Sequence, residues 1–135
     1  MPIQFKAIER GQPGIVGGGV KSFYAKIVFR GEATIDDLVK EIEKFSALSE
    51  PDIRGVVYAL ENVIQGRLAD SQIVRMEKLG TFYPSISSEP SDLATKVKSA
   101  SIRKVGVNYR PGKRILSALR EAAFEKVETT PNETP

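Results

Sequence analysis

The 135-residue sequence contains no cysteine and no histidine. Without cysteine, the chain can form neither a disulfide nor a thiolate metal site. Without histidine, it lacks the usual general base at neutral pH and the commonest neutral metal ligand. These absences argue against an enzyme, so we expect no catalytic residue, cofactor, metal or small-molecule substrate. A metal site built of carboxylates alone stays open.

Long apolar runs are also missing, so we expect no segment to cross a membrane. The first residues, MPIQFKAIERGQPG, include Lys6 and Glu9 and lack the apolar stretch of a secretory signal. We therefore expect a cytoplasmic protein. A length of 135 residues, 41% of them hydrophobic, fits one domain. We place this domain at residues 1–128, followed by a disordered tail, TTPNETP, at 129–135.

Acidic and basic residues are unevenly distributed, although the net charge is only +3. Acids outnumber bases between Ala33 and Asn62. Between Thr95 and Arg114 there is no acid, and the bases are Lys96, Lys98, Arg103, Lys104, Arg110, Lys113 and Arg114. A stretch of one sign creates a local field that attracts polyanions. We take these seven residues as candidate polyanion contacts, with a merely solvated basic face as the alternative.

The first half of the chain has a strand pattern followed by a helix pattern. Residues 3–8 and 22–29 are typical of strands. The glycine-rich segment between them lacks the Gly-Lys-Ser/Thr run of a phosphate loop, and no helix is predicted to start there. Apolar residues at the helical period predict a helix over residues 35–45, with Thr34 and Asp37 as a capping box. Ser49 and Pro51 predict the start of a second helix. Together they form a helical hairpin.

The second half predicts a sheet and a third helix. Residues 72–88 read as two strand segments with a turn at 78–80, and the polar segment after them is a loop or arm. Residues 102–109 alternate, which predicts a half-buried strand with Val105, Val107 and Tyr109 on one face. Pro111 and Gly112 end this strand, a short helix follows, and residues 124–128 can form a last strand.

This order of elements resembles the bacterial HU and integration-host-factor family. The resemblance is carried by FSALSEPDIRGVVYALENVIQGRLADSQIVRMEKLGTF at 45–82 and by NYRPGKRILSAL at 108–119. It covers about residues 33–119, the HU-like core. Residues 1–32 form an N-terminal β extension, and in this the chain is similar to the longer HU-related proteins.

The resemblance implies an α+β fold: an N-terminal strand pair, a helical hairpin, a three-stranded antiparallel sheet with a β-arm, and a short C-terminal helix. It implies a homodimer with a saddle of β-sheet and two arms that grip double-stranded DNA. A role in the nucleoid, in DNA condensation, would follow. On this basis the seven bases named above become candidate DNA contacts.

The arm departs from the family pattern. The family carries an Arg-Asn-Pro run near the arm tip, whereas this arm has only Pro90, with Glu89 before it and Asp92 after it. A proline that is inserted between base steps bends DNA in relatives, and acidic neighbours oppose that. The alternative function is therefore an HU-like dimeric structural or protein-interaction module that has lost DNA bending.

Residues 110–114 support the DNA hypothesis independently. Lys113 and Arg114 lie where the helix macrodipole is positive, which is unfavourable for stability but suited to binding a phosphate. Neutralisation by Glu121 or by acids of the first helix is the alternative. RNA binding through Phe82, Tyr83 and Tyr109 is a weaker reading, since these aromatics can simply pack the sheet. Asp36 and Asp37 fit a helix start better than a metal site.

Overall fold

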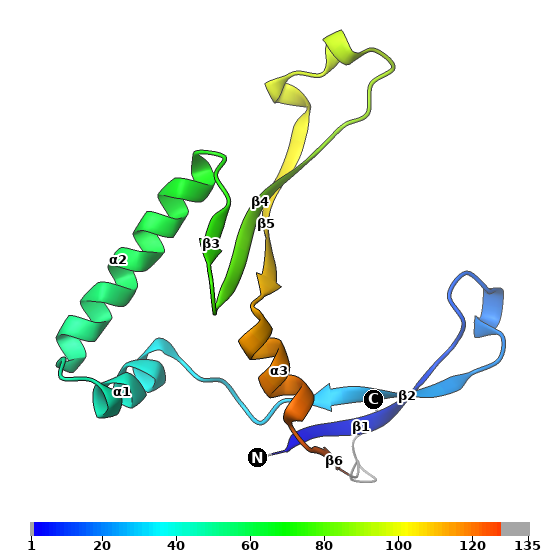
Figure 1. The fold of residues 1–135 in the computed structure, drawn as a ribbon. Coiled ribbons are helices and arrows are strands. Elements are labelled where there is room, and N and C mark those ends of the chain that lie inside the picture. Colours follow the sequence, from blue (N-terminus) through cyan, green and yellow to red (C-terminus); the bar gives the residue numbers. More distant parts are fainter. Residues whose placement is uncertain (1, 128–135) are drawn as a thin grey trace. The chain divides into compact units, whose positions relative to one another are not determined.

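We describe residues 2–127 of the protein from a computed structural model (Figure 1). The predicted tail at 129–135 lies outside the described residues. In chain order the strands and α-helices are β1 (Ile3–Arg10), β2 (Ser22–Val28), α1 (Ile35–Phe45), α2 (Glu50–Ala69), β3 (Val74–Met76), β4 (Gly80–Ser88), β5 (Ile102–Pro111), α3 (Lys113–Glu121) and β6 (Phe124–Lys126). The predicted α+β class is confirmed.

The chain divides into two compact units. The first comprises the residues up to Ala33 and those from Arg120 onward, and the second runs from Thr34 to Leu119. Each unit has a three-stranded sheet of its own. Among the described residues, no helix combines the length and the apolar character that a membrane span requires.

Both helices of the hairpin in the second unit begin at the predicted caps. The Thr34 backbone N–H donates to Oδ2 of Asp37 at 3.0 Å, and the Asp37 N–H donates to Oγ1 of Thr34 at 3.4 Å. The Thr34 hydroxyl also donates to Oδ2 of Asp37 at 3.1 Å. The two hydrogen bonds that Thr34 donates to the carboxylate, from its backbone N–H and from its hydroxyl, lower the pKa of Asp37 below its usual value. Ser49 accepts from the N–H of Asp52 at 3.5 Å and caps α2 in the same way. The capping box and both helix starts are therefore confirmed.

The sheet of the second unit is antiparallel, in the order β3-β4-β5. Successive side chains of a strand point to opposite faces, so the register divides the sheet into two faces. One face, called the basic face here, carries Arg75, Thr81, Tyr83, Ser85, Ser87, Lys104, Gly106, Asn108 and Arg110. The other, the apolar face, carries Val74, Met76, Phe82, Pro84, Ile86, Val105, Val107 and Tyr109.

Few side chains of this single chain are fully buried. Among the described hydrophobic residues, only Val39 and Ile53 are buried. The prediction of a half-buried strand at 102–109 is wrong for the single chain, because every residue of β5 is exposed. Helix α2 packs against β3 and β4, so the outer strand of the sheet lies uncovered. The alternation in the sequence therefore calls for a cover that the second unit, residues 34–119, does not itself provide.

The sheet of the first unit has the order β2-β1-β6. Strands β1 and β2 form the predicted antiparallel pair, and β6 adds to β1 in parallel. The Ile3 N–H donates to the carbonyl of Ala123 at 2.8 Å, and the Val127 N–H donates to that of Phe5 at 2.9 Å. The N-terminal extension is thus completed by the C-terminal end of the described chain, a pairing that the sequence analysis did not predict.

Candidate nucleic-acid interface

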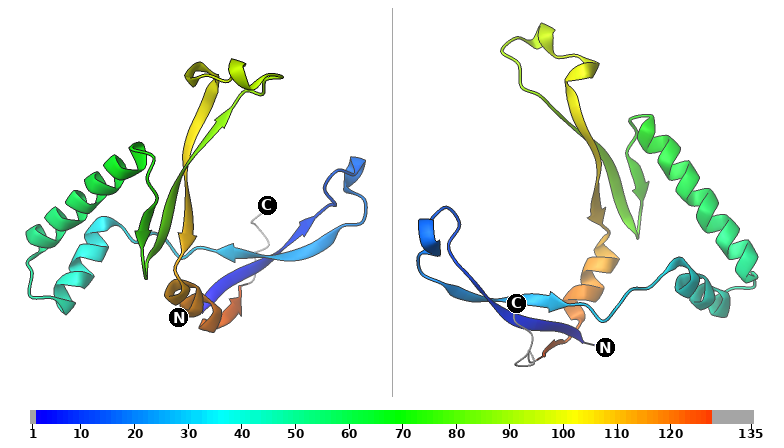
Figure 2. Two further views of the ribbon diagram at one scale, coloured as in Figure 1. Left: turned by 45° about the horizontal axis from the view of Figure 1, so that its top comes forward. Right: turned by 180° about the vertical axis from the view of Figure 1, so that it is seen from behind.

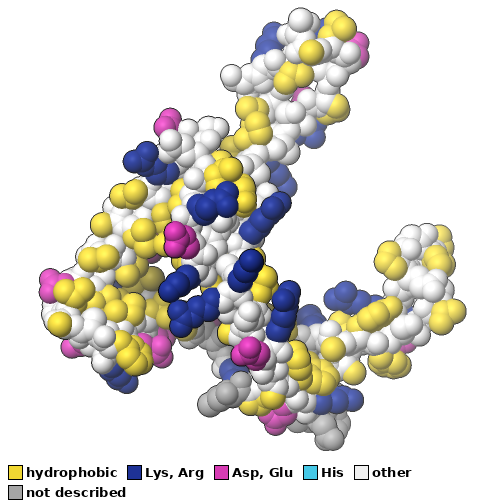
Figure 3. Space-filling model, in the orientation of Figure 1, with side chains coloured by type: hydrophobic (Ala, Val, Ile, Leu, Met, Phe, Trp, Pro, Cys, Tyr) yellow, Lys and Arg dark blue, Asp and Glu magenta, His cyan; other side chains and the backbone are white. Residues whose placement is uncertain are grey.

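The basic face of the second unit concentrates positive charge on a sheet surface without acids. Arg75 on β3 lies opposite Thr81 on β4, and Thr81 lies opposite Arg110 on β5, so the two arginines flank one threonine. Lys104 lies farther along β5 on the same face; at about 3.4 Å per residue it is roughly 20 Å from Arg110. Figure 3 shows Lys and Arg side chains gathered along this sheet. The surface offers cations and hydroxyls, the groups that bind phosphate oxygens.

Arg110 is oriented by an aromatic ring. Its guanidinium carbon lies 5.0 Å from the centroid of the Tyr83 ring, a cation–π contact between diagonal neighbours on the basic face. Tyr83 is half-buried, whereas Arg110 is exposed. The contact holds the charged group at the surface without neutralising it, so less side-chain entropy is lost when the arginine binds an anion.

Two glycines fix the turn at which the basic face ends. Gly80 has a φ of 132°, and a Cβ there would collide with the carbonyl oxygen of Arg110 and lie 2.7 Å from the Tyr109 ring. A Cβ on Gly112 would collide with the carbonyl of Lys78. The Tyr109 hydroxyl also donates to the carbonyl of Leu79 at 2.6 Å. Only glycine therefore allows the turn between β3 and β4 to approach the end of β5 so closely.

This close packing determines where α3 begins. The Gly112 N–H donates to Leu79 at 3.3 Å, and the Leu116 N–H then donates to Gly112 at 3.2 Å as the first helical bond. Lys113 and Arg114 are the first residues of α3 and both are exposed. Within residues 2–127, neither forms an ion pair, so neutralisation by Glu121 or by the acids of α1 is not observed there. The two cations stand beside the free N–H groups of a helix start, an arrangement suited to an anion.

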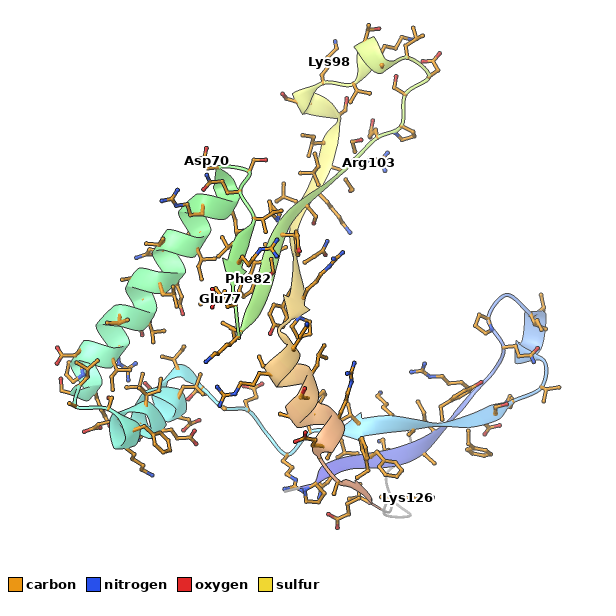
Figure 4. All side chains as sticks on the ribbon, in the orientation of Figure 1. Asp70, Glu77, Phe82, Lys98, Arg103 and Lys126 are labelled. Atoms are coloured by element: carbon orange, nitrogen blue, oxygen red, sulfur yellow. The ribbon has the colours of Figure 1, made fainter. Side chains whose placement is uncertain are left out.

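The arm differs from the sheet below it. Strands β4 and β5 form a ribbon, and residues 89–101 form its tip, closed by a hydrogen bond from the Glu89 N–H to Ser101 at 2.8 Å (Figure 2). Arg103 is paired with Glu89 at 2.9 Å, and Lys96 with Asp92 at 3.3 Å. Lys98, labelled at the tip in Figure 4, forms no ion pair within the described part of the chain. Two of the seven predicted contacts are thus already engaged by acids.

The seven predicted residues fall into three groups. Lys104 and Arg110 share the basic face, Lys113 and Arg114 follow at the start of α3, and the remaining three belong to the arm: Lys96, Lys98 and Arg103. Arg103 lies at the register shift opposite Ser87 and Ser88, which removes it from the alternation of the ribbon. Arg75 was not predicted, because it lies outside the acid-free stretch of the sequence. Arg75 lies on the basic face because it pairs with Thr81, and this pairing is known only from the strand register.

The other predicted groups have structural roles. Asp36 forms an ion pair with Arg54 that links α1 to α2, and Asp37 belongs to the α1 cap. Hydrogen bonding to Tyr58, and then to Asp36, raises the pKa of Arg54. Nowhere in residues 2–127 do three or more Asp, Glu, His or Cys gather to hold a metal. The rings of Phe82 and Tyr109 lie 5.2 Å apart on the apolar face, where they contact each other.

Comparison with known proteins places this geometry in a family. Among curated proteins, none matches the sequence. A crystal structure from Bacteroides vulgatus ATCC 8482, of a chain described as a "putative bacterial DNA binding protein", superposes with a TM-score of 0.70 at 10% sequence identity. The match covers 98% of this chain and 51% of that one, so this chain spans about half the length of that protein and shares its fold. Residues 1–126 match the model of one family, and the chain therefore belongs to the HU-HIG family, described as an HU domain fused to wHTH, Ig or glycine-rich motifs.

Proposed function

We propose that this chain is a histone-like DNA-binding protein that acts as a homodimer in the nucleoid and contacts the backbone of the duplex with little sequence specificity. The observation that carries the proposal is the basic face, where Arg75, Lys104 and Arg110 stand without an acid. Lys113 and Arg114 extend the same charge at the start of α3. Membership of a family of HU domains is consistent with this role.

The chemistry of the basic face favours phosphate over bases. Its other side chains are short or rigid: serines, a threonine, an asparagine, a glycine and the half-buried Tyr83. Arginine, lysine and hydroxyl groups on a sheet contact backbone phosphates, which position a protein on DNA but carry no sequence information. Such binding releases counterions, so its affinity falls steeply with salt.

The exposed apolar surface supports a homodimer. A chain of this length normally buries about two thirds of its unfolded surface, yet only Val39 and Ile53 are fully buried among the described hydrophobic residues. The apolar side chains of the helical hairpin that remain exposed include Leu38, Ile42, Phe45, Val56, Leu60 and Val63. A second copy that packs against this surface and against the apolar face would remove both from water, at about 25 cal/mol for each Å².

Binding to duplexes of arbitrary sequence tests the proposal. Fluorescence anisotropy with two 30-base-pair duplexes of unrelated sequence, at several salt concentrations, should give similar affinities and a steep decrease with salt. A strong preference for one duplex would contradict backbone recognition. No binding to either duplex at low salt would contradict the DNA-binding role altogether.

The arm favours a second candidate, an HU-like dimeric module that no longer bends DNA. Glu89 and Asp92 lie beside Pro90, and each is held in an ion pair with an arm base. An apolar wedge needs access to the base stack without repulsion from phosphates. If the arm does not act as a wedge, Pro90→Ala leaves the end-to-end distance of a fluorescently labelled duplex unchanged. A large change in that distance would reject this candidate.

A further inference from the structure

The sheet of the first unit contains an unfavourable pair of charges. Lys6 on β1 lies directly opposite Lys26 on β2 in the antiparallel register. Directly opposed residues have Cβ atoms about 4.5–5.5 Å apart, and like charges at this separation destabilise a sheet. Lys6 is also half-buried, which removes part of the water that would screen its charge. A neutral side chain at one of these positions would remove this repulsion.

The surrounding residues do not neutralise the pair. Within the described chain, neither lysine forms an ion pair. Arg10 lies on the same face, opposite Ser22, and adds a third cation. The acid on this face is Glu125 of β6, which is opposite Gln4 rather than either lysine. Within residues 2–127, no ion pair neutralises the positive charge of this face.

The two faces of this sheet differ in their share of basic and apolar residues. The face of the two lysines also carries Gln4, Ile8, Arg10, Ser22, Tyr24 and Val28, whereas the other carries Glu9, Lys126 and mainly apolar residues: Ile3, Phe5, Ala7, Phe23, Ala25, Ile27 and Phe124. The loop that joins β1 to β2, residues 11–21, contains no acid and ends in Lys21. From Arg10 to Val28, the hairpin thus carries no negative charge that would repel a polyanion.

We propose that the face of Lys6, Arg10 and Lys26 is a second binding surface for the phosphate backbone of duplex DNA, separate from the basic face of the second unit. The inference rests on the proposed DNA-binding function and extends it to the N-terminal hairpin. Phosphate oxygens between Lys6 and Lys26 replace the mutual repulsion of the lysines with two attractive interactions. The face is therefore less favourable for the free protein and favourable for the complex.

Charge reversal at one lysine separates binding from folding. Lys26→Glu replaces the repulsive pair with an attractive cross-strand pair, so the melting temperature of the free protein should rise. The same variant should bind a 30-base-pair duplex more weakly, and the slope of log affinity against log salt should fall by at least about 0.9. A role in folding alone cannot move stability and binding in opposite directions. Lys6→Gln with Lys26→Gln should lower the slope by about 1.8.

Lys126→Gln is the matched control. Lys126, which is labelled in Figure 4, belongs to the same sheet. It pairs with Phe5, so its side chain lies on the other face of the sheet from Lys6 and Lys26. Its removal should leave the salt slope unchanged. If Lys26→Glu binds duplex DNA as the unchanged protein does, the second surface does not exist, while the proposed function stands. If the unchanged protein binds no duplex at low salt, both are rejected.

Discussion

The two β-ribbons of this protein balance their charges differently. At the tip of the β4–β5 ribbon, Arg103 pairs with Glu89 and Lys96 with Asp92, so the charges of the tip largely cancel. In the β1–β2 ribbon, Lys6 and Lys26 face each other and no described acid pairs with them. Exposed ion pairs add little stability, but they occupy a cation that could bind a partner. The comparison teaches that a base in a ribbon becomes a candidate contact only after its neighbours are known.

The two sheets also differ in how they orient their cations. In the second unit, Arg110 lies over the ring of Tyr83 and its strand end is fixed by the contacts of Gly80 and Gly112. In the first unit, the described contacts include no ring contact or ion pair of Lys6 or Lys26. The described ring and backbone contacts therefore restrict Arg110 and its strand end, whereas none of them restricts the two lysines.

The largest effect is expected when a charge is placed on the apolar surface of the helical hairpin, compared with the same change on the N-terminal sheet. Leu60→Asp places a charge at a residue of α2 that is 43% exposed in the single chain. If a second copy covers this surface, the unpaired buried charge costs about 3–5 kcal/mol and the dimer dissociates or unfolds. Phe23→Asp, on the N-terminal sheet, is the matched change and should leave the dimer intact. Light scattering measures the mass of both variants, and a compact monomer for the unchanged protein would contradict the dimer.

A smaller effect is expected at the turns of the two units. Gly80→Ala meets a positive φ together with a collision with Arg110, so it should cost at least about 1–3 kcal/mol. Gly14 in the first unit has a φ of 81° with no atom within 4 Å of an added Cβ. Gly14→Ala should therefore cost only about 1–2 kcal/mol, for the left-handed backbone alone. Urea denaturation gives both values, and equal losses would show that the Gly80 contact is not important.

The smallest effect concerns the α1 cap and depends on pH. Because hydrogen bonds from Thr34 lower the pKa of Asp37, the cap contributes stability above the unfolded-state pKa and loses it as the pH falls through the lower, folded-state value. Thr34→Ala should cost about 1 kcal/mol at pH 7. The difference between this variant and the unchanged protein should shrink as the pH falls below the usual pKa of an aspartate, as measured by urea denaturation. A difference that is independent of pH would argue against the Asp37 contribution.

Local signals in the sequence were sufficient for most elements. Thr34, Ser49 and Pro51 locate the helix starts, and Pro111 with Gly112 locates the end of β5, because caps and turns depend on only a few neighbouring residues. The parallel pairing of β6 with β1 could not be predicted in this way. It joins Ile3 to Phe124, and no short-range pattern specifies a partner at that sequence separation.

The candidate site was predictable only in part. A search for a stretch free of acids finds Lys104, Arg110, Lys113 and Arg114, which the structure places on or next to the basic face. It also includes Arg103, whose partner Glu89 lies across the ribbon tip rather than in the stretch itself. It misses cations that strand pairing brings together, such as Arg75. Which face a strand residue occupies depends on register, and register is a property of two segments.

The salt dependence of a face-directed variant tests the central claim most directly. Arg75→Gln, Lys104→Gln and Arg110→Gln together remove the three cations of the basic face. A control triple, Lys40→Gln, Lys44→Gln and Lys126→Gln, removes the same charge from α1 and from the apolar side of the N-terminal sheet. Neither set should cost more than about 0.5 kcal/mol of folding stability for each change.

Duplex binding is then measured by anisotropy at several salt concentrations for the unchanged protein and both variants. The account predicts that the face variant lowers the slope of log affinity against log salt by about 2 to 3 on every duplex, and that the control triple leaves the slope unchanged. A face variant with normal thermal stability and an unchanged slope would contradict the account, because the basic face would then be a solvated surface that does not contact DNA.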